Sequence, residues 1–298
     1  ELYNTTRNRT LFSEPDEVPD RQDDIEIGYW EAAIGARQTL SRTQTVMLRA
    51  SVSRQNFTDD PTIDGVNFRA LKLDFYKGLD IGFLWRYSKV LPRLDMVINP
   101  TEGRRITLNY WFKSDEIFQD FIIEAGSFDE LFKQYNYHRI DLDWSEYKST
   151  PFIMDRSAIT VNFQGGYISR PVDDFLYYFA GGIRGLKGYS YYSIEGNKKA
   201  ILSTTYRFPL LRNIARQIGP WYFDKLYASV GYQVGDAWDT NGGPDIDNLK
   251  NVIDLGLRLD TFSFYAYPTK IGFNAAYGLD RTTFGSVETN NFSEQGRE

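Results

Sequence analysis

Apolar residues recur at every second position along many short stretches of the chain. The clearest case is residues 226–235, where the even-numbered residues are all apolar and the odd-numbered residues are mostly small or polar. The apolar set is Leu226, Ala228, Val230, Tyr232 and Val234. Because successive side chains of a strand point to opposite faces, this pattern predicts a strand with one apolar face and one polar face.

The same alternation appears in eight further stretches and, more weakly, in four others. The eight are residues 30–36, 46–52, 71–75, 106–112, 140–144, 159–163, 253–260 and 271–279, and the weaker ones are 80–87, 118–124, 175–180 and 200–208. No helical pattern of comparable strength occurs. The sequence predicts an all-β, antiparallel fold of about a dozen strands, each near the roughly ten residues that a tilted membrane strand needs.

The polar faces distinguish a membrane barrel from a soluble sheet. In residues 253–260, Asp254, Arg258 and Asp260 lie opposite a run of aliphatic residues, and a dry core would reject such charges. A soluble antiparallel sheet with its polar face in water is the alternative. Faces rich in Gly, Ser, Thr, Asn and Gln, with aromatic residues near strand ends, favour a transmembrane β-barrel with a hydrated interior.

Composition points the same way. The chain has 21 Tyr, 21 Phe and 6 Trp, 16% of its residues, which suits the aromatic girdles of an outer-membrane barrel. A Tyr-rich soluble sandwich or carbohydrate-binding domain is the alternative. No stretch reaches the roughly 18 apolar residues of a membrane helix, so a helical membrane protein is not expected.

Little in the chain could support catalysis. It has no cysteine and one histidine, which rules out disulfides, thiolate metal sites and chemistry that needs two histidines. His138 is predicted to lie on the same strand face as the apolar residues of 140–144. Asp141 and Asp143 lie on the opposite face, and nothing in the sequence indicates that they act as a general acid and base. A net charge of -6 argues against nucleic acid. We expect no enzyme activity, no cofactor and no metal.

Polar residues dominate both ends of the chain. Residues 1–24 are predicted to be a polar linker or loop without a signal peptide, residues 25–284 the barrel, and residues 285–298 a polar loop or tail. Both ends resemble cuts through a longer polypeptide, so we expect a fragment that lacks its final strand.

A glycine-rich segment interrupts the strands at residues 181–196, with five glycines in sixteen residues. Such a segment permits tight backbone packing and could present a basic side chain at the tip of an inward loop. From the residues alone, an ordinary glycine-rich surface loop remains open.

This region carries a resemblance to a known family. The matching residues are Gly181-Gly182, Leu186-Lys187-Gly188-Tyr189, Gly196 and Tyr206 to Leu210. They resemble the carboxy-terminal β-barrel of the surface-antigen superfamily, which includes the outer-membrane assembly factor and the two-partner-secretion translocases. Within it, the chain is most similar to barrels fused behind a periplasmic Tol-type β-propeller.

The resemblance implies a bacterial outer-membrane barrel of sixteen strands, in contact with lipids and with a periplasmic domain or partner proteins. Its sixth extracellular loop would fold into the lumen, where the arginine of the tetrad meets acidic residues on two wall strands. A guanidinium between carboxylates holds such a loop strongly.

The chain departs from that pattern at three positions. Lys187 replaces the tetrad arginine, Thr205 the wall glutamate and Gln233 the wall aspartate, while Arg207 follows on the same wall. Lysine keeps one charge without the bidentate fork, so the loop should be held more loosely. Arg184 is the alternative plug residue if the loop register is shifted.

Two functions remain open. The barrel could be a channel, or act in protein translocation or assembly, with the loop as a movable plug. Alternatively, it could be a sealed structural anchor that holds a periplasmic domain or partner complex at the outer membrane.

Overall fold

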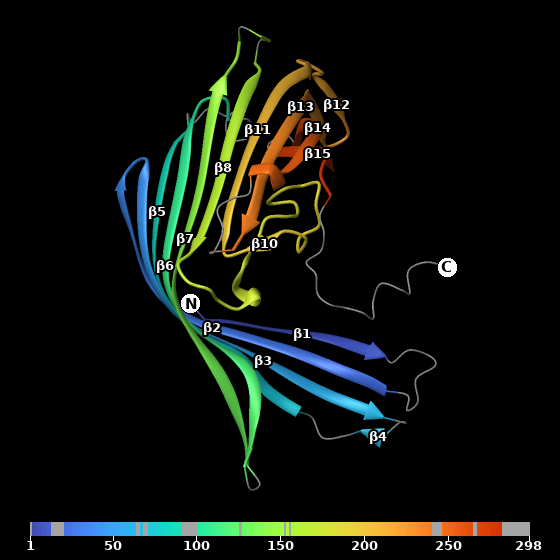
Figure 1. Ribbon diagram of the computed structural model, residues 1–298. Coiled ribbons are helices and arrows are strands. Elements are labelled where there is room, and N and C mark those ends of the chain that lie inside the picture. Colours follow the sequence, from blue (N-terminus) through green and yellow to red (C-terminus); the bar gives the residue numbers. More distant parts are fainter. Residues whose placement is uncertain are drawn as a thin grey trace. The chain divides into compact units, whose positions relative to one another are not determined.

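The computed structural model describes residues 2–12, 21–63, 66–67, 71–90, 100–124, 127–151, 153–154, 156–239, 246–264 and 267–281, which are almost entirely β-structure. The strands are β1 (Leu2–Phe12), β2 (Arg21–Ser41), β3 (Gln44–Ile63), β4 (Val66–Asn67), β5 (Leu71–Val90), β6 (Gly103–Glu124), β7 (Ser127–Ser149), β8 (Ala158–Ile168), β9 (Tyr178–Phe179), β10 (Glu195–Gly196), β11 (Lys198–Leu211), β12 (Arg216–Ile218), β13 (Trp221–Trp238), β14 (Lys250–Ser263) and β15 (Tyr267–Gly278) (Figure 1). Within this part of the chain, the helices are two short 3-10 turns, Asp174–Leu176 and Ile246–Asn248. None is long and apolar enough to cross a membrane.

The described chain divides into two compact units, and strands β5, β6 and β7 contribute to both. In the first unit, the hydrogen-bonded strand order is β1-β2-β3-β5-β6-β7. In the second, the order is β5-β6-β7-β8-β11-β13-β14-β15. Neighbouring long strands whose registers are described pair antiparallel, in agreement with the predicted fold class.

Three predicted segments differ in the structure or fall outside it. Most of the predicted linker is strand: β1 pairs with β2 from Leu2↔Ala32 to Phe12↔Gln22. Backbone hydrogen bonds can pair two strands whatever their side chains. Where a strand is polar on both faces, the sequence shows no alternation of apolar and polar residues. The weak strand predicted at 175–180 is instead a 3-10 turn followed by the two-residue β9. The predicted tail, 285–298, lies outside the described residues.

The strands of the second unit carry the predicted apolar face. Across β11, β13, β14 and β15, large apolar side chains on one face of the sheet are exposed: Leu202, Val230, Tyr232, Ile253, Leu255, Leu257, Ile271, Phe273 and Tyr277. Registers such as Val230↔Leu255 and Leu257↔Phe273 align them across the sheet. A contiguous apolar surface of this extent is typical of one that contacts hydrocarbon rather than water.

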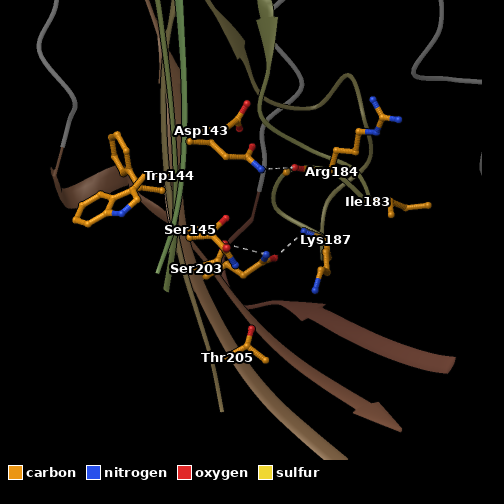
Figure 2. Close-up of a pocket in the computed structure, with 13 residues that line it drawn as sticks. Asp143, Trp144, Ser145, Ile183, Arg184, Lys187, Ser203 and Thr205 are labelled. Carbon is orange, nitrogen blue, oxygen red and sulfur yellow. Dashed lines mark hydrogen bonds between the residues drawn. The ribbon is translucent and has the colours of Figure 1, made fainter. Parts of the chain in front are cut away.

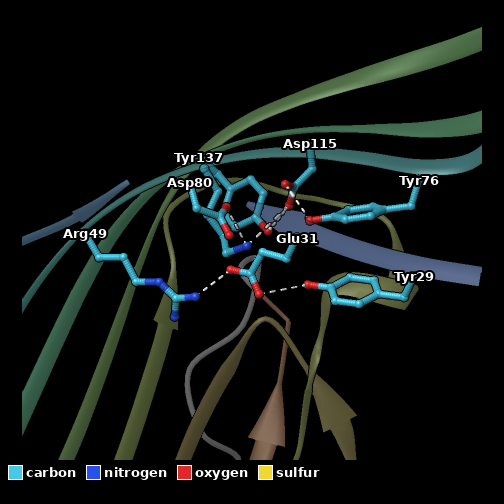
Figure 3. A network of polar contacts seen from close by, with 8 residues as sticks. Tyr29, Glu31, Arg49, Tyr76, Asp80, Asp115 and Tyr137 are labelled. Atoms are coloured by element: carbon cyan, nitrogen blue, oxygen red, sulfur yellow. Dashed lines mark hydrogen bonds and ion pairs between the residues drawn. The ribbon is translucent and has the colours of Figure 1, made fainter. Parts of the chain in front are cut away.

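The first unit has an equivalent apolar face and a polar face built from a hydrogen-bond network. Ile34, Leu48 and Ile81 are exposed on the apolar side. On the polar side, the fully buried Asp115 accepts hydrogen bonds from Tyr76 Oη at 2.9 Å and Tyr137 Oη at 2.6 Å (Figure 3). Each carboxylate oxygen is thus paired, as burial of a charge requires.

Three ion pairs extend this network across the first unit. Lys113 Nζ lies 2.8 Å from Asp80 and 3.9 Å from Asp115. Glu31 accepts from Arg49 Nη2 at 2.7 Å and from Tyr29 Oη at 3.3 Å (Figure 3). The network therefore holds three carboxylates and two cations, and each carboxylate has a cation within 4 Å.

Candidate functional site

Residues 180–197, the glycine loop, fold into a compact hydrogen-bonded unit between β8 and β11. Leu186 N donates to Ala180 O at 2.7 Å, and Ala180 N donates to Ile194 O at 2.8 Å. Gly182 N donates to Tyr189 O at 3.0 Å, which closes the turn around the tetrad. The loop thus has a defined conformation that presents its side chains in fixed directions.

Two glycines explain why this turn can lie so close to the sheet. A Cβ on Gly188 would lie 2.3 Å from the backbone nitrogen of Gly278, so the loop backbone packs directly on β15. Gly182 has a φ of +87°, in the region that favours glycine. Gly181, Gly185 and Gly196 are likewise in close backbone contact, with Ser190, Ala180 and Trp238.

Leu186 fixes the loop to the sheet by burial. It is fully buried in a cluster that joins Ala180 and Ile194 of the loop to Ile201 of β11, Ala237 of β13 and Val252 of β14. Complete burial of a leucine side chain contributes about 1.5–3 kcal/mol. Leu186 is therefore a principal anchor of the loop.

Lys187 makes two polar contacts with the sheet. Its backbone N–H donates to Gln233 Oε1 at 3.0 Å, and its Nζ donates to Asp254 Oδ1 at 2.7 Å. Gln233 Nε2 in turn donates to Ser203 Oγ on β11 at 3.2 Å (Figure 2). We call Lys187, Gln233 and Asp254 the latch.

Asp254 is the latch residue that sequence reasoning did not assign. The register pairs Asp254 with Gly231, two residues from Gln233, and a Cβ on Gly231 would lie 1.7 Å from Asp254 Oδ2. The absence of a side chain at 231 therefore makes room for the carboxylate. The sequence shows a charged face in residues 253–260. Which residue contacts Asp254 depends on the register of β13 against β14, and the sequence does not reveal that register.

Tyr189 provides a third anchor at the end of the β14–β15 pair. Its Oη donates to Asn251 O at 3.2 Å and accepts from Asp280 N at 3.0 Å. Asp280 lies beyond β15, and hydrogen bonds from the backbone and then the side chain of Asn251 hold its pKa below the usual value. The hydrogen bonds from Asn251 to the Asp280 carboxylate are therefore present at neutral pH and are lost as the pH falls through that lowered pKa.

The other predicted site residues lie around or outside a cavity of about 340 Å³ beside the loop. Thr205 lines it without a hydrogen bond to Lys187. Arg184 O accepts from Gln164 Nε2 at 3.1 Å, while the Arg184 guanidinium points away from Asp143 (Figure 2). Arg207 Nη2 donates to Pro100 O at 2.9 Å instead of reaching the loop. Of the two candidate basic residues, Lys187 is the one whose side chain contacts the wall, and Arg184 does so only through its backbone carbonyl.

His138 lies on the apolar face, as its register predicts. Its Nδ1 is 2.9 Å from Tyr110 Oη, and the two rings stack with centroids 5.8 Å apart. Among the described residues, no group of three or more His, Asp or Glu side chains could hold a metal ion.

Gly231→Ala should weaken the latch. The new methyl group would displace the Asp254 carboxylate, and a hydrogen bond to a charged group contributes about 1.5 kcal/mol at the low end of its range. Since Lys187 Nζ and its amide share the latch, we expect the Lys187 amide to exchange hydrogen about tenfold faster. Gly272→Ala is the control, because its Cβ would meet only Leu257 O at 3.8 Å. Equal exchange in both variants would contradict the proposed role of Gly231.

Comparisons with known proteins place this geometry in a family. The chain matches the Omp85 superfamily domain over residues 3–284. Among solved structures, it is similar to CdiB from Escherichia coli, with a TM-score of 0.52 and 13% identity over 95% of this chain and 47% of that one. It is also similar to BamA from Haemophilus ducreyi lacking POTRA domains 1-3, with a TM-score of 0.49 and 12% identity over 93% of this chain and 58% of that one.

The chain thus spans about half the length of the solved structures it matches. Among curated proteins, none is similar enough to count as a match. The family match, by contrast, covers nearly the whole chain. The chain therefore belongs to the Omp85 superfamily, whose members are β-barrel proteins of the outer membrane of Gram-negative bacteria.

Proposed function

We propose that the chain forms part of an outer-membrane barrel for protein translocation or assembly, or a channel, and that the glycine loop plugs its lumen. The observation that carries this proposal is the latch: Lys187 joins the loop to Gln233 and Asp254 on the polar face. In this proposal the barrel domain comprises residues 25–284 together with β1, which pairs with β2. Residues 285–298 are a polar loop or tail, and the polar face lines the lumen. The protein is not an enzyme.

The chemistry of the latch supports a plug that can be displaced. Lys187 provides a single charged contact, and its side chain remains 34% exposed. A partly hydrated lysine–carboxylate pair contributes far less than a buried bidentate arginine pair. A partner or cargo that offered its own carboxylate could therefore compete for Lys187 without a large energetic cost.

Planar-bilayer conductance of the full-length parent protein tests the plug. The intact protein should be closed, and deletion of residues 183–196 should open a steady conductance because it removes Leu186, Lys187 and Tyr189 together. Lys187→Ala should give intermittent opening, and Arg184→Ala, whose side chain is outside the latch, should stay closed. A deletion variant that inserts and remains closed would refute the plug.

The second candidate is a sealed structural anchor that holds a periplasmic domain or partner complex at the outer membrane. The full burial of Leu186 and the separate Tyr189 anchor favour it, because together they hold the loop independently of the latch. A locked loop distinguishes the two. A carbodiimide can join the Lys187 ammonium to the Asp254 carboxylate, because the two atoms lie 2.7 Å apart, and Lys187→Gln is the control that cannot be joined. Loss of translocation on cross-linking supports the plug, and unchanged function supports the anchor.

A further inference from the structure

A hollow at the ends of three strands in the second unit lies outside the loop site. The hollow has a volume of about 420 Å³ and is lined by Tyr87, Lys89, Glu102, Gly103, Arg104 and Glu146. It lies where β5 ends, β6 begins and β7 approaches its end. We call it the interface hollow.

The interface hollow borders the apolar face. Arg104 shares its parity on β6 with Ile106 and Leu108, and Glu146 shares its parity on β7 with Ile140 and Trp144. Ile140 and Trp144 are exposed. The Arg104 guanidinium carbon lies 5.8 Å from the Trp144 ring centroid. A tryptophan with a polar partner beside aliphatic residues is typical of the membrane–water interface.

The charged groups of the hollow use only some of their hydrogen-bond donors and acceptors to bind one another. Arg104 Nε donates to Glu146 Oε2 at 2.5 Å, and Trp144 Nε1 donates to the same oxygen at 3.3 Å. Within the described part of the chain, the terminal nitrogens of Arg104, the ammonium of Lys89 and the carboxylate of Glu102 make no hydrogen bond or ion pair. Two cationic and two anionic side chains therefore meet in one hollow, with unused donors and acceptors.

We propose that the interface hollow binds the headgroup of phosphatidylethanolamine. Lys89 and Arg104 donate to its phosphate, Glu102 and Glu146 accept from its ammonium, and its acyl chains lie along the apolar face. A zwitterionic headgroup matches two charges of each sign, whereas an anionic lipid or the bisphosphorylated lipid A would meet two uncompensated carboxylates. A choline headgroup has no N–H to donate, so the two carboxylates also favour ethanolamine over choline.

The position in the strands is consistent with this occupant. Ser149 ends β7 and Ala158 begins β8. At the other end of β8, Ile168 N donates to O of Asn197, the last residue of the glycine loop, at 2.9 Å. The hollow is thus at the strand ends opposite the glycine loop and faces the other leaflet. If the loop is on the extracellular side, the hollow faces the periplasmic leaflet, which is made of phospholipid.

Native mass spectrometry of the full-length protein tests this binding. The protein is purified in detergent and offered equal amounts of phosphatidylethanolamine, phosphatidylcholine and phosphatidylglycerol. We expect one preferentially retained phosphatidylethanolamine. The double variant Lys89→Gln with Glu102→Gln, which leaves the net charge unchanged, should lose about fivefold in affinity, the size of one exposed charged contact. The charge-matched control is Lys72→Gln with Glu116→Gln, on the first unit, and should bind like the natural protein.

A second measurement separates a specific site from general lipid contact. Glu102→Leu alone should reduce the preference for ethanolamine over choline while total phospholipid retention is kept, because leucine has no oxygen to accept from the headgroup N–H groups. Equal retention of all three lipids by the natural protein would mean annular lipid only and would overturn the proposal. So would a preference for phosphatidylglycerol, or a double variant that folds and retains phosphatidylethanolamine like the control.

Discussion

Asp115→Ala should lower the free energy of unfolding by about 3–5 kcal/mol, the cost of breaking a buried charge network by removing one partner. Asp115 is fully buried and accepts from Tyr76 and Tyr137. Its loss would remove the carboxylate to which two buried phenol hydroxyls donate and one of the two counter-ions of Lys113. Urea unfolding in detergent micelles, followed by tryptophan fluorescence, measures the change.

Two companion variants control for the loss of a carboxylate. Asp115→Asn keeps one carbonyl acceptor and should lose less stability than Asp115→Ala. Glu26→Ala removes an exposed carboxylate and should change stability by no more than about 0.5 kcal/mol. If Asp115→Ala were as mild as Glu26→Ala, the network would not stabilise the first unit.

Leu186→Ala should open the glycine loop. Large-to-small changes at a fully buried leucine cost about 2–5 kcal/mol. Here the loss falls on loop docking, because three of the five other residues of the buried cluster belong to the sheet. The amides of Leu186 and Tyr189, which close the loop turn, should exchange hydrogen at least tenfold faster. If the plug proposal is right, the same variant conducts.

Ile183→Ala is the matched control for this change. Ile183 lies three residues away in the same loop but is 90% exposed, so its truncation removes a comparable apolar side chain without opening a cavity. Its exchange rates and conductance should equal those of the natural protein. A loop that opened with Ile183→Ala and stayed closed with Leu186→Ala would contradict the assignment of Leu186 as anchor.

The alternation of side chains predicted the strands wherever one face is apolar, but it underestimated their length. The stretch predicted at 140–144 is part of the 23-residue strand β7. In another part of the same strands, Gln134 of β7 donates a hydrogen bond to Ser114 of β6 at 3.2 Å. Both residues are even-numbered, like the apolar residues of 140–144 and 106–112, so the face that is apolar there is polar here. Where both faces are polar, periodicity disappears, although the backbone pairing continues.

For the loop, the motif identified Lys187 and Gln233, and the structure brings these two residues together. It could not identify Asp254, because the contact depends on the pairing of β13 with β14. Nor could it identify Asp280, which is 91 residues from Tyr189 in the chain and lies beside it through the β14–β15 pair. Contacts of this kind follow from register and not from local sequence.

The absence of a side chain at Gly231 links the identity of this residue to that of Asp254 on the neighbouring strand. A chain with any larger side chain at 231 has no space for the Asp254 carboxylate in its present position. A larger side chain at 231 would move that carboxylate away from Lys187, so the contact needs glycine at one position and aspartate at the other. We therefore expect positions 231 and 254 to vary together, and not independently, among related chains.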